Sequence, residues 1–150
     1  IIASCIKGND VLKELNLKVN RIGAKGASVL AAILKETQIT NLSLGGKDIG
    51  VEGASALAAV LKETQINHLG VDGDALQIDE LTGTKPTEKT DLSGKGLGAR
   101  LGVASAIIIA NCIKGNGVLK ELTVDGHPLQ IDELKGTKPT EKIDLSRKGL

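Results

Sequence analysis

The sequence of 150 residues contains no Phe, Tyr, Trp or Met. Its core must therefore be built from Leu, Ile, Val and Ala, since hydrophobic residues make up 41% of the chain. Without aromatic side chains, the protein lacks both the stacking surfaces used for single-stranded nucleic acids and the Tyr and Trp anchors of many binding hot spots. The 19 basic and 18 acidic residues nearly cancel, so no charge argument favours nucleic acid or an anionic membrane.

Long apolar runs and paired cysteines are also missing. The longest apolar stretch, residues 104–112, is interrupted by Ser105 and Asn111 and is far shorter than a membrane span, so we expect no direct membrane insertion. No signal peptide is visible and the sequence does not begin with Met. Cys5 and Cys112 lie far apart, and we expect both to be buried, reduced thiols. That favours an intracellular protein, in the cytoplasm or in an organelle.

Most of the chain consists of internal copies. Residues 12–65 form two 27-residue copies that are identical at 15 of 27 positions. Residues 71–97 match residues 124–150 at 22 of 27 positions, and residues 1–17 match residues 108–124 at 13 of 17. Repetition at such periods is typical of arrays in which each copy is one structural unit.

Each 27-residue copy combines two hydrophobic periods. Apolar residues alternate in its first part, LKELNL or ITNLSL, as they do in a half-buried strand. In its second part Ala27, Leu30, Ala31 and Leu34 recur at the spacing of one helix face. A strand–turn–helix unit cannot bury its apolar face alone. We therefore expect stacked units, with the strands in a parallel sheet on one side and the helices on the other.

The pattern LxxLxLxxNxIGxxGAxxLAxxL from Leu12 to Leu34 resembles the leucine-rich repeat of the ribonuclease-inhibitor type. That type includes the repeats of nucleotide-oligomerisation-type receptors and of Ran GTPase-activating proteins. The resemblance implies an α/β leucine-rich-repeat solenoid, a horseshoe segment with a parallel concave sheet and convex helices. An Asn bonds backbone groups in the turn after each strand of that family, and Asn20 alone occupies that position here. Its counterparts in the other units are Lys47, Asp74, Lys95, His127 and Lys148.

Short, helix-poor units are interspersed in the expected array. Pro86 and Pro139 exclude a regular helix in residues 69–89 and 122–142, where we expect extended or single-turn structure. Between them we expect a helix over residues 102–114, about one turn longer than its neighbours.

We expect residues 1–150 to form a single array, and interpret it as a fragment of a longer one because both ends fall inside a unit. The expected strands lie near residues 12–17, 39–44, 66–71, 89–92, 119–124 and 142–145.

Chemical motifs are weak. The glycine-rich turn at residues 94–98 could cradle a phosphate, but it lacks the G-x-G-x-x-G spacing, and the internal copy has Arg147 in place of Gly94. We interpret it as a structural turn. His68 and His127 lie two strands apart, and neither belongs to a recognisable metal-binding or nucleophile–His–acid motif. We therefore expect no metal, no cofactor and no catalytic residue.

The candidate binding site is the open face of the sheet, where side chains between the buried leucines point to solvent. Its side chains are small, polar and of mixed charge, and the alternative interpretation is a solvated surface that binds no partner. The candidate protein-binding residues are Lys13, Glu14, Asn16, Lys18, Thr40, Asn41, Ser43, His68, Asp72, Asp91, Ser93, Lys120, Glu121, Thr123 and Asp125, followed by Asp144 and Ser146 in the last expected strand.

These features favour a non-catalytic protein-interaction or scaffold module with protein partners. Two alternatives remain open at this point. One is an architectural subunit of a larger assembly. The other is a GTPase-activating regulator of the Ran-activator type, for which only Arg21, Arg100 and Arg147 could stabilise transition-state charge.

Overall fold

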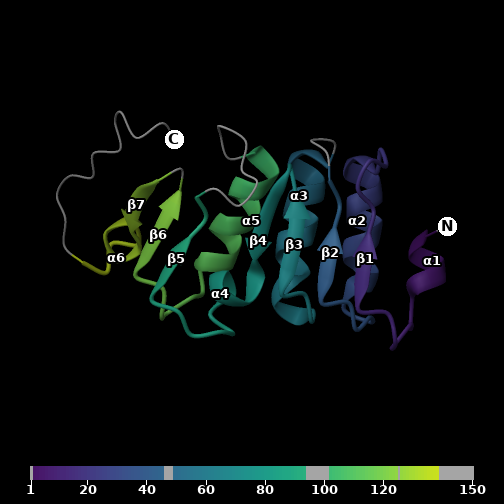
Figure 1. The fold of residues 1–150 in the computed structure, drawn as a ribbon, viewed down its shortest axis with the longest axis horizontal. Coiled ribbons are helices and arrows are strands. Elements are labelled where there is room, and N and C mark those ends of the chain that lie inside the picture. The colour runs from purple at the N-terminus through teal and green to yellow at the C-terminus, as the bar shows by residue number, and fades with distance from the viewer. Residues whose placement is uncertain (1, 46–48, 94–101, 125, 139–150) are drawn as a thin grey trace.

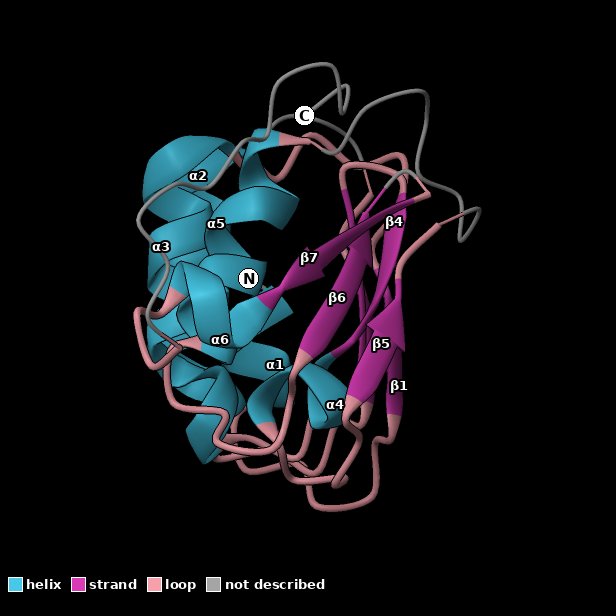
Figure 2. Cartoon of the chain, turned by 90° about the vertical axis from the view of Figure 1, so that its left-hand side faces the viewer, coloured by secondary structure: helices cyan, strands magenta, loops and turns pink. Residues whose placement is uncertain are grey.

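The chain folds as a mixed α/β structure of two layers. A computed structural model describes residues 2–45, 49–93, 102–124 and 126–138. Seen end-on, the helices cover one face of the strands and leave the other face open (Figure 2). The elements follow one another along the long axis, with α1 at one end and α6 and β7 at the other (Figure 1). No helix in the described ranges has the length and apolar character to cross a membrane.

The helices and strands alternate along the chain. The helices are α1 (Ile2–Ile6), α2 (Gly23–Leu34), α3 (Gly50–Val60) with a short 3₁₀ extension η1 (Leu61–Glu63), α4 (Ile78–Thr82), α5 (Val103–Ile113) and α6 (Ile131–Leu134). The strands are β1 (Glu14–Asn16), β2 (Asn41–Ser43), β3 (His68–Val71), β4 (Asp74–Gln77), β5 (Lys89–Asp91), β6 (Glu121–Val124) and β7 (His127–Gln130). The first five expected strand segments each contain one of these strands, whereas the sixth, residues 142–145, lies outside the described residues.

The parallel strands pair in the register of the sequence repeat. Leu15, Leu42 and Leu69 lie side by side in β1, β2 and β3, so the register advances by 27 residues from strand to strand. In the second sheet Thr90 of β5 pairs with Leu122 of β6, a step of 32. Because the register equals the repeat, equivalent side chains stack in rows and present the same face to the core.

The expectation of one continuous parallel sheet is wrong for the described strands. The chain has a four-stranded sheet, β1-β2-β3-β4, and a three-stranded sheet, β5-β6-β7, and each ends in an antiparallel strand. The first hairpin turns at Asp72 and Gly73, which have φ of +55° and +89°. Positive φ at both central residues defines the turn that matches strand twist best, and Asp-Gly is a preferred sequence for it. The hairpin thus places β4 where a parallel neighbour of β3 was expected.

The helices bury the face that the sequence predicts. Ala27, Leu30, Ala31 and Leu34 are the buried residues of α2, which confirms the helical spacing. The predicted extra turn in α5 is wrong, since α5 has 11 residues, as α3 does, and α2 has 12. It begins only after Gly102, whose backbone is extended (φ −68°, ψ 154°), so the glycine caps the helix and does not lengthen it.

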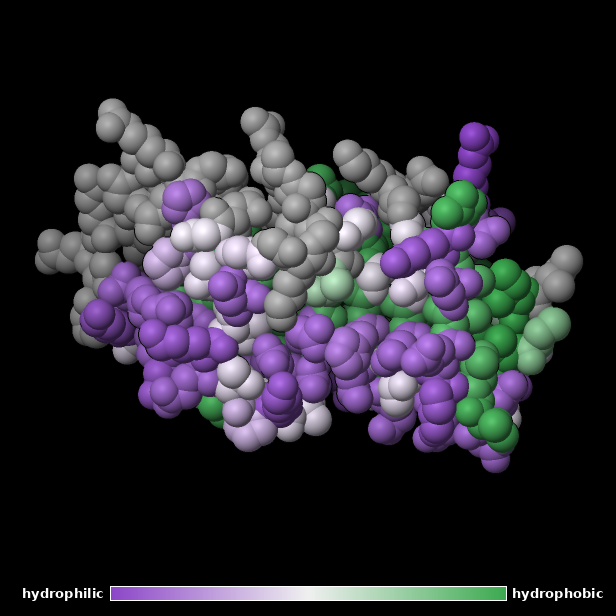
Figure 3. Space-filling view, viewed as in Figure 1, coloured by the Kyte–Doolittle hydropathy of each residue, from purple (hydrophilic) through white to green (hydrophobic). Residues whose placement is uncertain are grey.

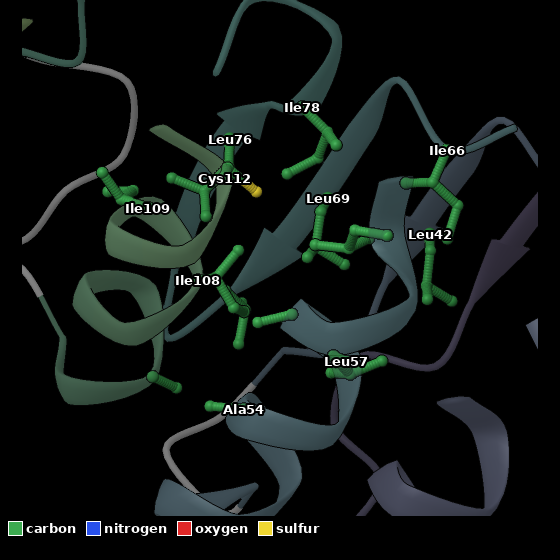
Figure 4. Packing of buried hydrophobic residues seen from close by; sticks show 14 of the residues in the cluster. Leu42, Ala54, Leu57, Ile66, Leu69, Leu76, Ile78, Ile108, Ile109 and Cys112 are labelled. Atoms are coloured by element: carbon green, nitrogen blue, oxygen red, sulfur yellow. The ribbon is translucent and has the colours of Figure 1, made fainter. Parts of the chain in front are cut away.

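The core is one continuous cluster of aliphatic side chains between the two layers. Figure 4 shows residues of β2, β3, β4, α3 and α5 meeting in it. Because α4 is a single short helix, α5 packs directly against α3 as well as against α4. Small residues bring α2 and α3 together: a Cβ on Gly53 would lie 2.8 Å from the Cβ of Ala27. This close approach compensates in part for the lack of large side chains.

The two cysteines differ, which corrects the expectation that both are buried. Cys112 is 1% exposed in α5, whereas Cys5 in α1 is exposed. Both are free thiols. The cause is packing: α5 is covered by α3 and α4, while α1 contacts α2 on one side. Burial raises the pKa of the Cys112 thiol to about 11, despite the opposing effect of the nearby Lys62 ammonium.

Candidate functional site: the open face of the sheets

Two rows of side chains cross the open face of the first sheet. Leu42, Leu69 and Leu76 are buried on the helix side, so the residues on either side of them in each strand point to the open face. The strand register aligns them in two rows, one of Glu14, Asn41, His68 and Gln77 and one of Asn16, Ser43, Gly70 and Ala75. The first row is linked by a hydrogen bond that the Asn41 amide donates to the Glu14 carboxylate at 3.2 Å.

The second row forms the floor of a hollow of about 430 Å³. Ser43, Gly70 and Ala75 lie directly beside one another across β2, β3 and β4, and none has a side chain large enough to fill the space. Lys18 and His68 also line it. Among the described residues that line it there is no carboxylate, so its only full charge is the Lys18 ammonium. The hollow can therefore accept a polar or negatively charged group.

The second sheet repeats this architecture with different side chains. Its two rows are Lys89, Glu121 and Gln130, and Asp91, Thr123 and Pro128. Thr123 and Pro128 replace Gly70 and Ala75, so larger side chains occupy the positions that form the floor of the hollow in the first sheet.

Charges on the second sheet are paired with one another. Gln130 donates a 2.8 Å hydrogen bond to Glu121, and Lys89 lies 3.3 Å from the same carboxylate. The Gln130 bond, followed by Lys89, lowers the pKa of Glu121. Lys120 and Glu88 form a second pair at 2.5 Å, in which the Lys120 hydrogen bond lowers the pKa of Glu88. These exposed pairs contribute little to stability but neutralise the charges that a ligand would meet.

Asp72 is not part of the open face, contrary to expectation. It lies in the β3–β4 turn, and its carboxylate accepts a 3.0 Å hydrogen bond from the backbone N–H of Ala104. A Cβ on Gly102 would collide with the Asp72 side chain, so a larger residue there would displace this carboxylate. Asp72 therefore caps the N-terminus of α5 from 32 residues upstream, where its negative charge also favours the helix dipole.

Several other candidate residues are committed to backbone contacts. The Asn16 side chain accepts a hydrogen bond from the Lys18 N–H at 3.0 Å, and the Thr40 hydroxyl donates to the Lys13 carbonyl at 3.2 Å. Asp91, the exposed last residue of β5, accepts a 2.8 Å hydrogen bond from the Ser93 N–H through its side chain.

Ser93 itself accepts a 2.8 Å hydrogen bond from the Gly126 N–H and so links the end of β5 to the turn between β6 and β7. Asp125, Asp144 and Ser146 lie outside the described residues. The glycine-rich turn at residues 94–98 lies outside them too, as do Arg100 and Arg147, whereas Arg21 is exposed before α2.

Sequence reasoning missed Asn116, the most heavily hydrogen-bonded buried polar residue described. Its amide donates to the carbonyls of Glu80 and Leu81 at 2.9 and 3.1 Å, and its oxygen accepts from the N–H groups of Val118 and Leu119. It thereby satisfies the end of α4 and fixes the approach to β6. The only sequence signal was its copy, Asn9, which makes the same two turn bonds.

The described residues of the open face supply hydrogen-bonding groups, and we identify no reactive centre among them. No group of three or more His, Cys, Asp or Glu side chains in the described ranges could hold a metal ion. Comparisons of the chain with protein-family models, with curated proteins and with solved structures found no match.

Proposed function

We propose that the chain is a non-catalytic protein-interaction module of the leucine-rich-repeat type, which binds a protein partner on the open face of its first sheet. The observation that carries this proposal is the hollow over Ser43, Gly70 and Ala75, built from small residues that the 27-residue register and the β3–β4 hairpin bring together. Helices cover the opposite face of these strands, so this face is free to receive a partner.

The chemistry of the hollow favours an acidic or polar loop of that partner. Lys18 supplies a positive charge to its lining, and Ser43, Asn41 and His68 supply hydrogen-bonding groups. No aromatic anchor is present, so hydrogen bonds and one ion pair carry the contact, and we expect modest affinity that weakens with salt.

The repeat character supports the assignment to this type. Strand–turn–helix units of 27 residues stack in register, and Asn20 donates from its amide to the Leu17 and Lys18 carbonyls at 3.2 and 3.3 Å. Such a bond to the turn after the strand is what the resemblance implies for that Asn.

A peptide selection tests the proposal. Short random peptides are selected on the wild-type chain and then rebound to Gly70→Leu, which fills the hollow, and to Thr123→Leu, the matched change at the equivalent position of the second sheet. We expect enrichment of Asp and Glu, loss of binding to Gly70→Leu and retention by Thr123→Leu. Peptides that bind Gly70→Leu as well as the wild type would remove the hollow as the site.

A further inference from the structure

Ion pairs join the ends of neighbouring helices on the helix side of the chain. The tripeptide LKE occurs at the end of α2 and again as η1 after α3. The Lys35 ammonium lies 2.8 Å from the Glu63 carboxylate, and the Lys7 ammonium lies 3.6 Å from the Glu36 carboxylate. Each of these lysines therefore pairs with the glutamate of the next unit.

This series of ion pairs stops at Lys62. The next long helix packed against α3 is α5, which leads into the tripeptide IKG, so Gly115 stands where the α2 and α3 units have Glu36 and Glu63. Gly115 still lies beside Lys62, because a Cβ on this glycine would be 2.6 Å from the lysine Nζ. Among the described residues Lys62 has no ion-pair partner. The repeat thus places the lysine as before but supplies no carboxylate for it.

A cleft of about 450 Å³ opens at this point between α3 and α5. It is lined by Lys62, Lys114, Asn111, Gly115 and two alanines of α3. The alanines and the glycine are too small to fill the space. The described lining contains two lysines and no acidic side chain, so its net charge is positive.

Asn111 is a second position at which this cleft differs from the preceding helices. Two residues before the tripeptide, α2 and α3 have Ala32 and Ala59, whereas α5 has Asn111. The Asn111 amide donates one hydrogen to the Ile107 carbonyl at 3.0 Å, and an amide has a second hydrogen to donate. One difference between the units therefore removes a carboxylate, and the other adds a hydrogen-bond donor. Both favour a negatively charged ligand.

A carboxylate fits this cleft better than a phosphate does. The cleft lies at the C-terminal ends of α3 and α5, where a helix presents carbonyl oxygens and the negative end of its dipole. Phosphates favour helix N-termini, whose N–H groups they accept. A carboxylate carries less charge and can be held by ammonium groups alone, as the Glu63 carboxylate is by Lys35.

The cleft and the hollow lie on opposite sides of the strands. Figure 3 shows the face of the strands, which carries many hydrophilic side chains, whereas α3 and α5 cover the other face (Figure 2). A ligand in one of the two sites therefore does not occupy the other.

We propose that the cleft between α3 and α5 binds an acidic segment of a partner protein. An Asp or Glu side chain of that segment takes the place of the carboxylate that the preceding units supply from within the chain. Lys62 and Lys114 hold this side chain, and Asn111 donates a hydrogen bond to it. Exposed ion pairs are individually weak, so the cleft gives modest affinity that falls with added salt. This second interaction surface does not depend on the hollow.

Amide NMR of the isotope-labelled chain, titrated with a blocked tetraglutamate peptide at low salt, tests the proposal. We expect the Gly115 amide signal to shift and to saturate, and the corresponding tetraglutamine peptide to leave it in place. Inorganic phosphate at matched ionic strength should bind more weakly than the acidic peptide. The Gly70 amide reports the hollow separately, so a response of Gly70 without Gly115 would overturn this proposal and leave that of the hollow standing.

Two matched pairs of variants identify the site. Gly115→Glu supplies the missing carboxylate from within the chain and should raise the dissociation constant of the peptide at least about threefold. The variant can fold, because the φ of Gly115 is not positive and its close neighbour is the mobile end of Lys62. Gly117→Glu adds the same charge where a Cβ would meet nothing within 4 Å, and it should weaken binding less. Lys62→Gln should weaken binding, whereas Lys35→Gln should not, because the Lys35 ammonium already pairs with Glu63.

Three results would overturn the proposal. One is a Gly115→Glu variant that binds the acidic peptide as tightly as the wild type. Another is an equal loss of affinity in each variant and its control, which would mean that the peptide responds to surface charge in general. The third is phosphate binding as tight as that of the peptide, which would exclude the preference for a carboxylate.

Discussion

Removing the Asn116 side chain is the sharpest test of how the helix-poor units are held in the fold. The side chain makes four hydrogen bonds, two to the carbonyls of Glu80 and Leu81 and two from the N–H groups of Val118 and Leu119, all between 2.9 and 3.1 Å. The α4 helix spans Ile78–Thr82 and is too short to be stable by itself, so its end depends on this partner.

The expected cost of Asn116→Ala follows from these contacts. Each buried hydrogen bond contributes about 1 kcal/mol net, and a buried carbonyl left without its partner costs about 1–3 kcal/mol. Some of the four groups can be reached by water after the substitution, since Val118 is partly exposed. We therefore expect the free energy of unfolding to fall by about 2–4 kcal/mol, a large share of the ~5–15 kcal/mol that is typical of a domain.

The internal copy provides the matched control. Asn9→Ala removes the same two turn bonds, to Val11 and Leu12, but in an exposed loop and without a contact to a helix end. Its cost should stay below about 1 kcal/mol, because water replaces the lost bonds. Asn116→Asp separates the accepted hydrogen bonds from the donated ones. It keeps the acceptor for the N–H groups of Val118 and Leu119, but it directs a carboxylate oxygen at the two α4 carbonyls to which the amide donated. It should cost at least as much as Asn116→Ala.

Urea unfolding followed by circular dichroism measures all three variants at the same protein concentration. Linear extrapolation gives the free energy, and an unchanged slope shows that the extent of unfolding is the same. If the losses in unfolding free energy for Asn116→Ala and Asn9→Ala agreed within about 0.5 kcal/mol, the contact of Asn116 with α4 would not be what stabilises this unit.

Two further predictions concern titratable groups. A thiol reagent at pH 8 should modify Cys5 rapidly and Cys112 only after unfolding, because Cys112 is 1% exposed and its raised pKa of about 11 keeps it protonated; equal rates for the two would contradict the packing of α5. The pKa of Glu88 is lowered by its hydrogen bond from Lys120, so the stabilisation from this pair is present above pH 4.5 and is lost as the pH falls through the lowered pKa. Because the pair is exposed, thermal melts of wild type and Glu88→Gln should differ by a small amount at neutral pH and converge in acid, and a difference that persists in acid would exclude the pair as its source.

The sequence predicted the parts of the fold that depend on local periodicity. The buried face of α2, from Ala27 to Leu34, follows from the 3.6-residue spacing, and the register of Leu15, Leu42 and Leu69 follows from the 27-residue copy length. In both cases the physical cause, burial of one face, acts on every copy in the same way.

The hairpins were missed although their signal is local. Asp72-Gly73 between Val71 and the alternating residues of β4 is a strong hairpin sequence. The extended backbone of β4 and the short α4 agree with the extended or single-turn structure expected in residues 69–89, but the antiparallel pairing of β4 with β3 was not expected. Asp72 and Asn116 could not be placed for another reason. Their partners lie 32 and about 35 residues away, and only the tertiary structure brings them together.

The candidate site also combines features that the repeat predicts with features that it does not predict. The two sheets share one core template, and their open faces differ where the copies differ: Ala75 corresponds to Pro128, and Gly70 corresponds to Thr123. A buried position must satisfy the same packing in each copy, whereas an open position is free to change, so the repeat predicts the core but not the surface. The hollow on the first sheet exists because two of these open positions hold small residues beside Ser43. The positions at which binding is to be sought in such an array are therefore those at which aligned copies diverge, because the shared residues are already explained by the fold.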